Sequence, residues 1–310
     1  MTSPRPFEGA CRIDDWGVIR TRGADATTFL QGQLTNDVLG LDAGRARLAG
    51  FCSAKGRLQA SFVVWKAGDD EFLLACSASL LAATLKRLSM FVLRAKCKLS
   101  DASDEILLWG LAGGAATAAL GNAASWEKRE RDGAAVIRLP DAEGTTRALF
   151  AAPPGVEPAA APALALATWR WLEVRSGIVT IEAATVDRFV PQMVNFELVG
   201  GVDFQKGCYP GQEVVARSQY RGTTKRRTLL FDCDAVPTAG QDVYVGGDAN
   251  EPAGTVANAA PHPEHLGGSA LVEVRLAALG ADLRLGGADG QQLRRRPLPY
   301  PVPLDVAAPA

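Results

Sequence analysis

A change of pattern near residue 227 limits what this 310-residue chain can fold into. Upstream, single helical segments alternate with apolar strand-like runs, which is typical of α+β layers with helices packed on antiparallel sheets. Downstream, short apolar runs recur about every 8–12 residues between glycines and prolines, which predicts a small β-barrel or sandwich. The sequence therefore predicts an α+β region over residues 1–227 and a C-terminal β-barrel domain over residues 228–310.

Apolar runs and turn residues locate the individual elements. Strands are predicted over residues 12–23, 60–66, 72–77, 106–113, 134–139 and 146–151, and then over 229–233, 242–245, 254–257 and 269–275. Helices are predicted after an Asp25 cap, over 80–91, before Gly121, over 162–176 and after Gly211. The alanine- and proline-rich residues 151–162 are expected to form a linker.

The composition excludes several classes of site. Lys plus Arg number 33 and Asp plus Glu number 34, so the net charge of −1 gives no general attraction to nucleic acid or to an anionic membrane. The six cysteines include no CxxC pair and only two histidines are present, which excludes zinc-ribbon, ferredoxin-type and multi-histidine sites. We therefore expect no metal ligands and a reducing compartment.

The sequence also argues against a membrane protein. The first residues lack the apolar stretch of a secretory signal. Residues 106–126 are uncharged and long enough to span a bilayer, but they contain four glycines and several polar residues. A buried strand, a glycine turn and a short alanine-rich helix explain this stretch better. We expect a cytoplasmic protein without a membrane partner.

The segment VDFQKGCYPGQEVVARSQYRGTTKRR has the features of a reactive site. Two glycines bracket Cys208, so a tight turn presents one thiol near the start of a helix. The helix start and the ammonium of Lys206 favour the thiolate over the thiol, whereas Glu213 opposes them. Cys208 is therefore predicted to be a reactive thiol assisted by Lys206. The alternative is a small buried hydrophobic residue, as most free cysteines are.

Two further features fit a ligand but also have an ordinary explanation. From Arg217 to Arg227 the chain has five basic residues and no acidic one, which suits an anion site or an RNA contact as well as a solvated loop. Phosphates and the glutamate carboxylates of a folate tail are candidate ligands. Trp16 and Trp169 fit either the planar walls of a site for a flat heteroaromatic ligand or the core, and their spacing does not choose between the two.

The central segment resembles the signature of a known family. KGCYPGQEVVAR, preceded by PQMVNFELVGGVDF and followed by QYRG, is similar to the signature of the YgfZ-type folate-binding proteins, which support iron–sulfur enzymes and tRNA modification. These proteins are relatives of the glycine-cleavage T-protein, an aminomethyltransferase. DDWGVIRTRGADATTFLQGQLTNDV and FCSAKGRL resemble the family's opening segments, so the resemblance covers about residues 10–230.

The resemblance implies a fold, a cofactor and a set of residues. The fold would be α+β, a three-domain cloverleaf in which two interleaved α+β domains and a small C-terminal β-barrel surround a folate cavity. Tetrahydrofolate or a derivative would be the cofactor, contacted by Trp16 and Trp169, and Cys208 would be the essential thiol. The further candidate cofactor-binding residues are Arg175, Gln192, Asn195, Tyr209, Gln212, Glu213 and Arg217.

Two positions depart from the family pattern. Arg175 stands where many relatives have a glutamate that, in the T-protein, holds the pteridine. Gln59 and Ala60 stand where the T-protein has an Asp-Asp pair, so no carboxylate remains there to orient or deprotonate an aminomethyl amine. We therefore expect that aminomethyl transfer is lost while the folate cavity persists.

These features together predict a tetrahydrofolate-binding accessory protein for iron–sulfur cluster assembly or repair and, through iron–sulfur client enzymes, for tRNA modification. Its expected partners are folate, iron–sulfur apo-enzymes or cluster carriers, and RNA at Arg217 to Arg227; the sequence has no iron–sulfur motif of its own. The alternative is a folate-dependent aminomethyl or one-carbon transferase, and a third interpretation is an RNA-associated factor that works through Arg217 to Arg227. Whether the protein catalyses turnover is left open by the sequence.

Overall fold

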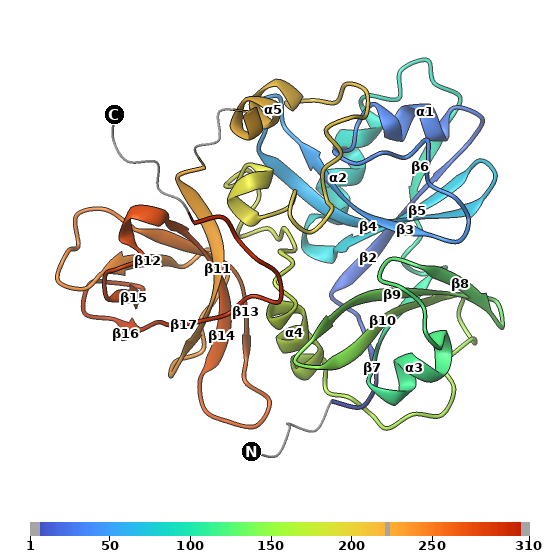
Figure 1. The fold of residues 1–310 in the computed structure, drawn as a ribbon. Helices are drawn as coiled ribbons and strands as arrows, with labels where there is room; N and C mark the ends of the chain where they lie inside the picture. The colour runs from blue at the N-terminus through green and yellow to red at the C-terminus, as the bar shows by residue number, and fades with distance from the viewer. Residues whose placement is uncertain (1–6, 221–223, 305–310) are drawn as a thin grey trace.

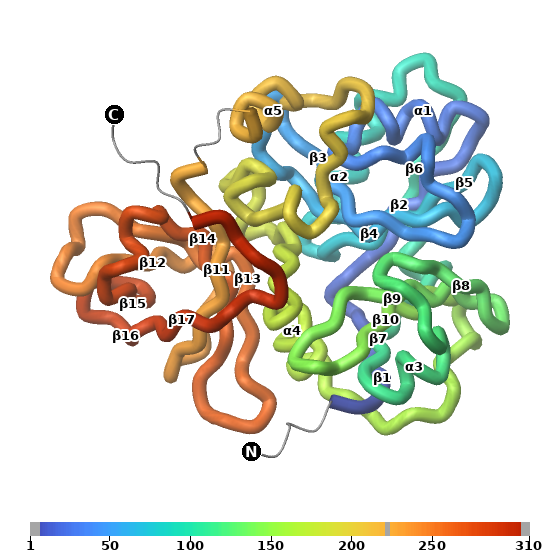
Figure 2. Tube along the Cα trace, viewed as in Figure 1, coloured from blue at the N-terminus to red at the C-terminus, as the bar shows by residue number. Residues whose placement is uncertain are grey.

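Three antiparallel β-sheets surround one helix in the computed structural model, which describes residues 7–220 and 224–304. Two of the sheets have five strands each and the third has seven. Helix α4 (Leu166–Arg175) lies where the three sheets meet (Figures 1 and 2). This arrangement confirms the predicted α+β fold with a C-terminal barrel-like sheet.

The first sheet has the strand order β3-β4-β5-β2-β6. Its strands are β2 (Trp16–Arg22), β3 (Ala46–Cys52), β4 (Leu58–Gly68), β5 (Glu71–Ser77) and β6 (Lys98–Asp101). Helices α1 (Ala26–Gln31) and α2 (Ala78–Ser89) pack on it through a core that includes Phe29, Phe62 and Leu81. The strands predicted over residues 60–66 and 72–77 are confirmed as β4 and β5, which pair antiparallel as a hairpin.

The second sheet has the strand order β1-β7-β10-β9-β8 and is covered by α3 (Gly114–Leu120). Its strands are β1 (Gly9–Arg12), β7 (Leu107–Ala112), β8 (Lys128–Arg131), β9 (Ala134–Ala142) and β10 (Thr145–Ala152). The strand predicted over residues 12–23 is confirmed over Trp16–Arg22 as β2, which pairs with β5. Its start is corrected: Arg12 ends β1, which pairs with β7 of the second sheet, and residues 13–15 cross between the two sheets.

Two predicted helix starts are also corrected. Asp25 precedes α1, but its carboxylate does not cap that helix; it accepts a hydrogen bond from the backbone N–H of Lys96 at 2.6 Å. The helix predicted over residues 162–176 begins only at Leu166. The residues before it are extended, because the Pro162 carbonyl and the N–H of Leu164 both bond to the backbone of Ala10 in β1.

The third sheet curls into a near-closed barrel with the strand order β16-β15-β12-β13-β14-β11-β17 (Figure 1). Its strands are β11 (Arg226–Cys233), β12 (Asp242–Val245), β13 (Gly254–Pro261), β14 (Gly268–Arg275), β15 (Leu283–Leu285), β16 (Gln291–Gln292) and β17 (Arg294–Arg296), and the 3-10 turn η2 (Leu276–Ala278) follows β14. The four predicted strands are confirmed as β11 to β14. Strand β17 pairs with β11, so the proline-rich tail begins on the barrel itself.

A shared core joins the three sheets around α4. The same hydrophobic cluster contains Leu58 of the first sheet, Ala112 of the second, Leu172 of α4 and Leu271 of the barrel. The indole N–H of Trp171 donates to the Ser269 hydroxyl at 3.0 Å, which ties α4 to β14. Two further elements, the 3-10 turn η1 (Pro191–Val194) and helix α5 (Gln212–Tyr220), lie between α4 and the barrel along the chain.

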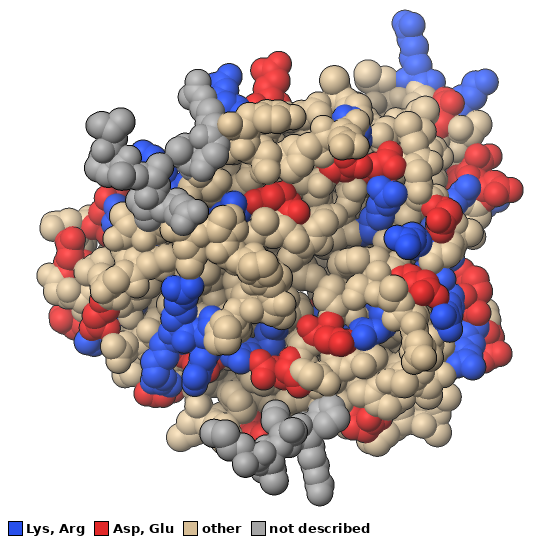
Figure 3. Space-filling model, viewed as in Figure 1, with Lys and Arg blue, Asp and Glu red and all other residues tan. Residues whose placement is uncertain are grey.

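The surface carries both signs of charge. On the face drawn in Figure 3, basic and acidic side chains are interspersed over all three parts of the molecule. In the described part of the chain, no helix combines the length and hydrophobicity needed to cross a membrane. Those residues also contain no cluster of three or more His, Cys, Asp or Glu side chains arranged to hold a metal ion.

Candidate functional site

A cavity opens where the three sheets meet beside α4. One part leaves room of about 40 Å³ for the centres of water-sized groups, within about 420 Å³ of space that includes open solvent. It is lined by residues of the first and second sheets and of α4, including Trp16, Arg147 and Glu173. An adjoining part leaves about 30 Å³ within about 300 Å³, shares Trp16 and Glu173, and reaches Glu182 and, in the barrel strand β13, Asn258. We call the two parts the central cavity. Its walls come from segments far apart in sequence.

Trp16 forms an aromatic wall of this cavity. It is half-buried at the first position of β2, where it pairs with Ser77 of β5. The guanidinium of Arg170 lies 5.8 Å from the centre of its ring, and Arg170 is itself held by Asp15 and Glu173. The indole is thus fixed by a cation from α4 while it remains in the lining of the cavity.

Trp169 has a different place, beneath the cavity. It is fully buried in α4 and does not line either part. Its ring fills the space above Gly110 of β7, where a Cβ atom would lie only 2.6 Å from Trp169 Cε3. The guanidinium of Arg147 covers the ring at 5.1 Å and itself lines the cavity. Trp169 therefore supports a lining residue, Arg147.

Arg147 is one of the lining residues that the sequence did not reveal. Its side chain is buried in β10, and burial lowers the pKa of its guanidinium to about 10. Its Nε donates to the Pro140 carbonyl at 3.1 Å, while its Nη1 has no hydrogen-bond partner among the described residues. A buried donor without a partner is costly, and Arg147 carries this donor on a side chain that lines the cavity. The only signal for it in the sequence is one arginine within the apolar run of β10.

Glu173 and Arg175 of α4 face different sides of the helix. Glu173 lines the cavity, whereas Arg175 forms ion pairs with Glu143 and with Asp232, the latter at 3.0 Å. This follows from helix geometry, because residues two apart point about 200° apart around the axis. Arg175 is not among the residues that line the cavity. The acidic group of this wall is Glu173.

The adjoining part contains a second carboxyl group. The Asn258 amide donates to Glu182 at 2.8 Å. Burial raises the pKa of Glu182, although this hydrogen bond from Asn258 acts in the opposite direction. The sequence gives no sign that Glu173 and Glu182 meet, because one lies on a helix and the other in the following loop.

The loop of residues 206–211, which we call the Cys208 loop, is held in place by a contact between two glycines. Gly211 has φ +77° and Gly56 has φ +71°. A Cβ atom on Gly211 would lie 2.6 Å from the Cα of Gly56 and closer still to the carbonyl oxygen of Ser53. Only glycine satisfies both the left-handed backbone and this close approach. The two motifs FCSAKGRL and KGCYPGQE therefore pack directly against each other.

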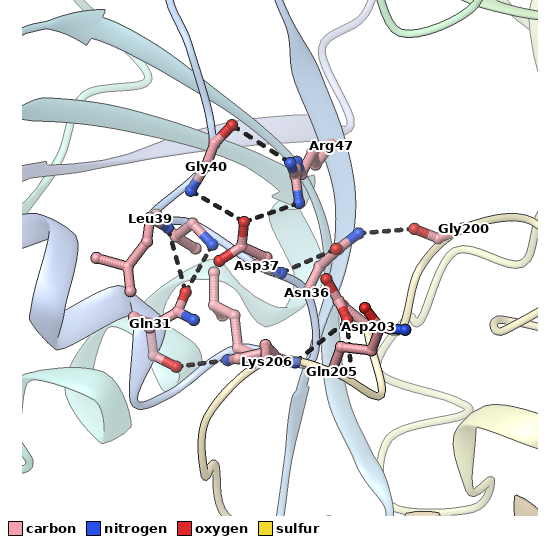
Figure 4. Close-up of polar contacts among 12 residues, drawn as sticks. Gln31, Asn36, Asp37, Leu39, Gly40, Arg47, Gly200, Asp203, Gln205 and Lys206 are labelled. Atoms are coloured by element: carbon pink, nitrogen blue, oxygen red, sulfur yellow. Dashed lines mark hydrogen bonds and ion pairs between the residues drawn. The ribbon is translucent and has the colours of Figure 1, made fainter.

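Lys206 is buried at the start of this loop and points into the protein. Its Nζ donates to the carbonyl oxygens of Gln31 and Leu34 at 2.5 Å each, at the end of α1 (Figure 4). It also lies 5.1 Å from the centre of the buried Tyr209 ring. Burial lowers the pKa of Lys206 to about 8. Lys206 and Tyr209 thus anchor the loop on the first sheet.

Cys208 itself is exposed, which rules out the interpretation as a buried hydrophobic residue. Of the other five cysteines, four are buried and Cys97 is half-buried. Burial raises the pKa of Cys52 and Cys76 to about 12. Cys208 does not line the central cavity, so the structure does not bring the predicted thiol together with Trp16.

The remaining predicted residues also lie outside the central cavity. The Gln192 amide donates to the Val215 carbonyl at 2.8 Å, and the Asn195 amide donates to the Thr228 carbonyl at 2.7 Å. These bonds fasten η1 to α5 and to β11. The other three, Gln212, Glu213 and Arg217, lie on α5.

Gln59 stands where the T-protein has the first residue of its acidic pair, and its side-chain amide is hydrogen-bonded to a carboxylate. Gln59 donates to the Asp187 carboxylate at 2.8 Å, and the Ser53 hydroxyl donates to the same oxygen at 3.1 Å. A carboxylate is therefore present beside Gln59, contributed from elsewhere in the chain. It does not line the central cavity.

Comparison with known proteins identifies the family. Residues 9–136 match the family model described as the GCVT N-terminal domain. The chain is 36% identical to the tRNA-modifying protein YgfZ of Edwardsiella ictaluri, covering 93% of this chain and 91% of that protein. The chain belongs to the YgfZ family. Its identity to the tRNA-modifying protein YgfZ of Klebsiella pneumoniae is 32%, with the same shares of both chains covered.

A solved structure confirms the resemblance in fold. The crystal structure of the glycine cleavage system aminomethyltransferase T from Bartonella henselae matches with a TM-score of 0.73 and 16% sequence identity. The match covers 97% of this chain and 87% of that one. At this identity the likeness establishes the T-protein fold alone.

Proposed function

We propose that this chain binds tetrahydrofolate or a derivative in the central cavity and works as an accessory protein in the cytoplasm. In this role it would support iron–sulfur cluster assembly or repair and, through iron–sulfur client enzymes, tRNA modification. The observation that carries the proposal is the unpartnered guanidinium nitrogen of Arg147 in a cavity also lined by Trp16 and Glu173. The relatives' names, which refer to tRNA modification, support the second part.

The residues present fit a reduced folate. Such a ligand has a planar pyrimidinone ring with N–H donors and an oxygen acceptor, which suits an aromatic wall, a carboxylate and a buried donor. Trp16 would contact the ring, Glu173 would accept from ring N–H groups, and Arg147 would donate to an oxygen. Each contact uses a group that already lines the cavity.

We propose that Cys208 acts at the protein surface, on partner proteins, and not inside the central cavity. Its thiol is exposed on a loop that Lys206, Tyr209 and the contact between Gly56 and Gly211 hold in place. A single cysteine cannot hold a cluster alone, but an exposed one can supply a ligand or a thiol to a partner. The proposed partners are iron–sulfur apo-enzymes or cluster carriers, which would dock on this loop while folate occupies the cavity.

A folate-dependent aminomethyl or one-carbon transferase is the second candidate. The observation in its favour is the Asp187 carboxylate beside Gln59, which supplies an acidic group near the position of the T-protein's pair. Its position outside the lining of the central cavity favours the accessory role, because a general base must lie within hydrogen-bond reach of its substrate.

A tetrahydrofolate titration monitored by tryptophan fluorescence tests the cavity assignment. We expect binding with quenching in the wild type, and binding weakened about fivefold or more in Trp16→Leu, since an aromatic contact is worth about 1 kcal/mol. Trp109→Leu is the matched control, because Trp109 is a half-buried tryptophan of β7 that does not line the cavity. Absence of binding to the wild type at millimolar tetrahydrofolate would refute the assignment.

A further inference from the structure

A second hollow, the α5 groove, lies on another part of the molecule. It leaves room of about 360 Å³ for the centres of water-sized groups between η1, α5 and the start of β11. Its lining includes Gln192 and Met193 of η1, Arg217 and Ser218 of α5, and Lys225 and Arg226 at the start of β11. It shares no lining residue with the central cavity.

The groove carries uncompensated positive charge. Among the described residues, its lining has three basic side chains and no acidic one. Arg226 is neutralised by Glu273, with Nη2 to Oε2 at 3.0 Å. Arg217 and Lys225 are exposed and have no ion-pair partner among residues 7–220 and 224–304. Two cations are thus free to bind an anion. Arg221, another of the five basic residues noted in the sequence, lies outside the described residues.

A buried oxygen atom of Gln192, in the lining of the groove, requires a hydrogen-bond donor. The Gln192 side chain is fully buried, and its amide N–H donates to the Val215 carbonyl. Its Oε1 has no hydrogen-bond partner among the described residues. Buried acceptors are normally satisfied, so this oxygen calls for a donor. A nucleobase offers an N–H donor for this oxygen, whereas a phosphodiester group offers none.

The helix that carries Arg217 also carries an exposed aromatic side chain. Tyr220 is 79% exposed and stands three positions after Arg217 on α5, so the two side chains lie on the same side of the helix. An exposed aromatic ring beside cations is the usual platform for a base of single-stranded nucleic acid.

We propose that the α5 groove binds a phosphorylated nucleoside presented by single-stranded RNA. Arg217 and Lys225 would hold the phosphate, the Gln192 oxygen would accept from a base N–H, and Tyr220 would stack on a base. Single strands fit because their bases are unstacked and accessible. The proposal goes beyond folate binding and does not depend on it.

Fluorescence anisotropy with a labelled single-stranded RNA oligonucleotide tests this site. We expect the double variant Arg217→Gln/Lys225→Gln to bind at least about tenfold more weakly and to show a shallower salt dependence, because two phosphate contacts are lost. Tyr220→Ala should bind several-fold more weakly at all salt concentrations, because it removes stacking. Arg94→Gln, which removes an exposed arginine elsewhere, should bind like the wild type.

Competition with AMP shows whether the ligand of the α5 groove is a free nucleotide or single-stranded RNA. Displacement of the RNA by AMP at micromolar concentration would assign the groove to free nucleotides and overturn the RNA proposal, whereas RNA binding that resists AMP supports it. Equal RNA affinity in the wild type and the double variant, or no RNA binding at all, would also overturn it. Unchanged melting temperature and tetrahydrofolate affinity in the double variant would show that neither the fold nor the central cavity was disturbed.

Discussion

Substituting Gly211 by alanine tests how the Cys208 loop is held. The φ of +77° costs an alanine about 1–2 kcal/mol. Its Cβ would also meet the backbone of Gly56 at 2.6 Å, and backbone atoms cannot rotate away as a side chain can. Forcing packed groups apart costs about 1–3 kcal/mol more. We therefore expect the free energy of unfolding to fall by about 2–5 kcal/mol, measured by urea denaturation.

Two matched glycines separate strain from crowding. Gly133 has φ +82° and open space around its Cβ position, so Gly133→Ala should lose only the backbone term of about 1–2 kcal/mol. Gly207, in the same loop as Cys208, also has open space and has no positive φ, so Gly207→Ala should change stability by less than about 0.5 kcal/mol. The reasoning is refuted if Gly211→Ala is no more destabilising than Gly133→Ala.

Three further predictions concern the thiol, the buried lysine and catalysis. Cys208 should be alkylated faster at pH 7 than the other cysteines because it alone is exposed, as measured by mass spectrometry, and a faster reaction at any other cysteine contradicts this. The substitution Cys208→Ala should change the free energy of unfolding by less than about 0.5 kcal/mol. Burial lowers the pKa of Lys206 to about 8, so the unfolded chain holds that proton to higher pH than the folded protein does. The unfolding free energy should rise relative to that of Lys206→Met as the pH increases from about 8 towards 10.5, both measured in a Cys208→Ser background; parallel pH profiles would show that the lysine is not desolvated. The protein should not turn over a lipoyl-bound aminomethyl substrate, and turnover at the rate of a genuine T-protein would favour the transferase function over the accessory role.

The sequence predicted those parts of the fold in which local pattern and tertiary pairing agree. The β4–β5 hairpin and helix α2 follow from apolar runs and amphipathic spacing. The pattern failed where a distant partner decides the structure. Residues 162–165 have helical composition but pair with Ala10 of β1, and β17 is a strand of three arginines formed only because β11 lies beside it.

The candidate site shows the same limit. The signature around Cys208 was visible in the sequence, because tight turns and exposed thiols have local signals. The lining of the central cavity was only partly visible. Trp16 was noted, but Arg147 and Glu173 were not, since their function depends on which side of a strand or helix meets two other sheets. Trp169 was noted as a wall, whereas it lies beneath Arg147.

The central claim separates the folate cavity from the exposed thiol, and calorimetric titration of tetrahydrofolate into two variants tests it. Arg147→Gln removes the unpartnered donor of the cavity, and Cys208→Ser changes only the exposed thiol. A hydrogen bond from a charged group is worth about 1.5–3 kcal/mol, so Arg147→Gln, at unchanged melting temperature, should raise Kd about tenfold or more. Cys208→Ser should leave Kd within about twofold of the wild type, because the thiol does not line the cavity. Full affinity in Arg147→Gln together with lost affinity in Cys208→Ser would contradict the account.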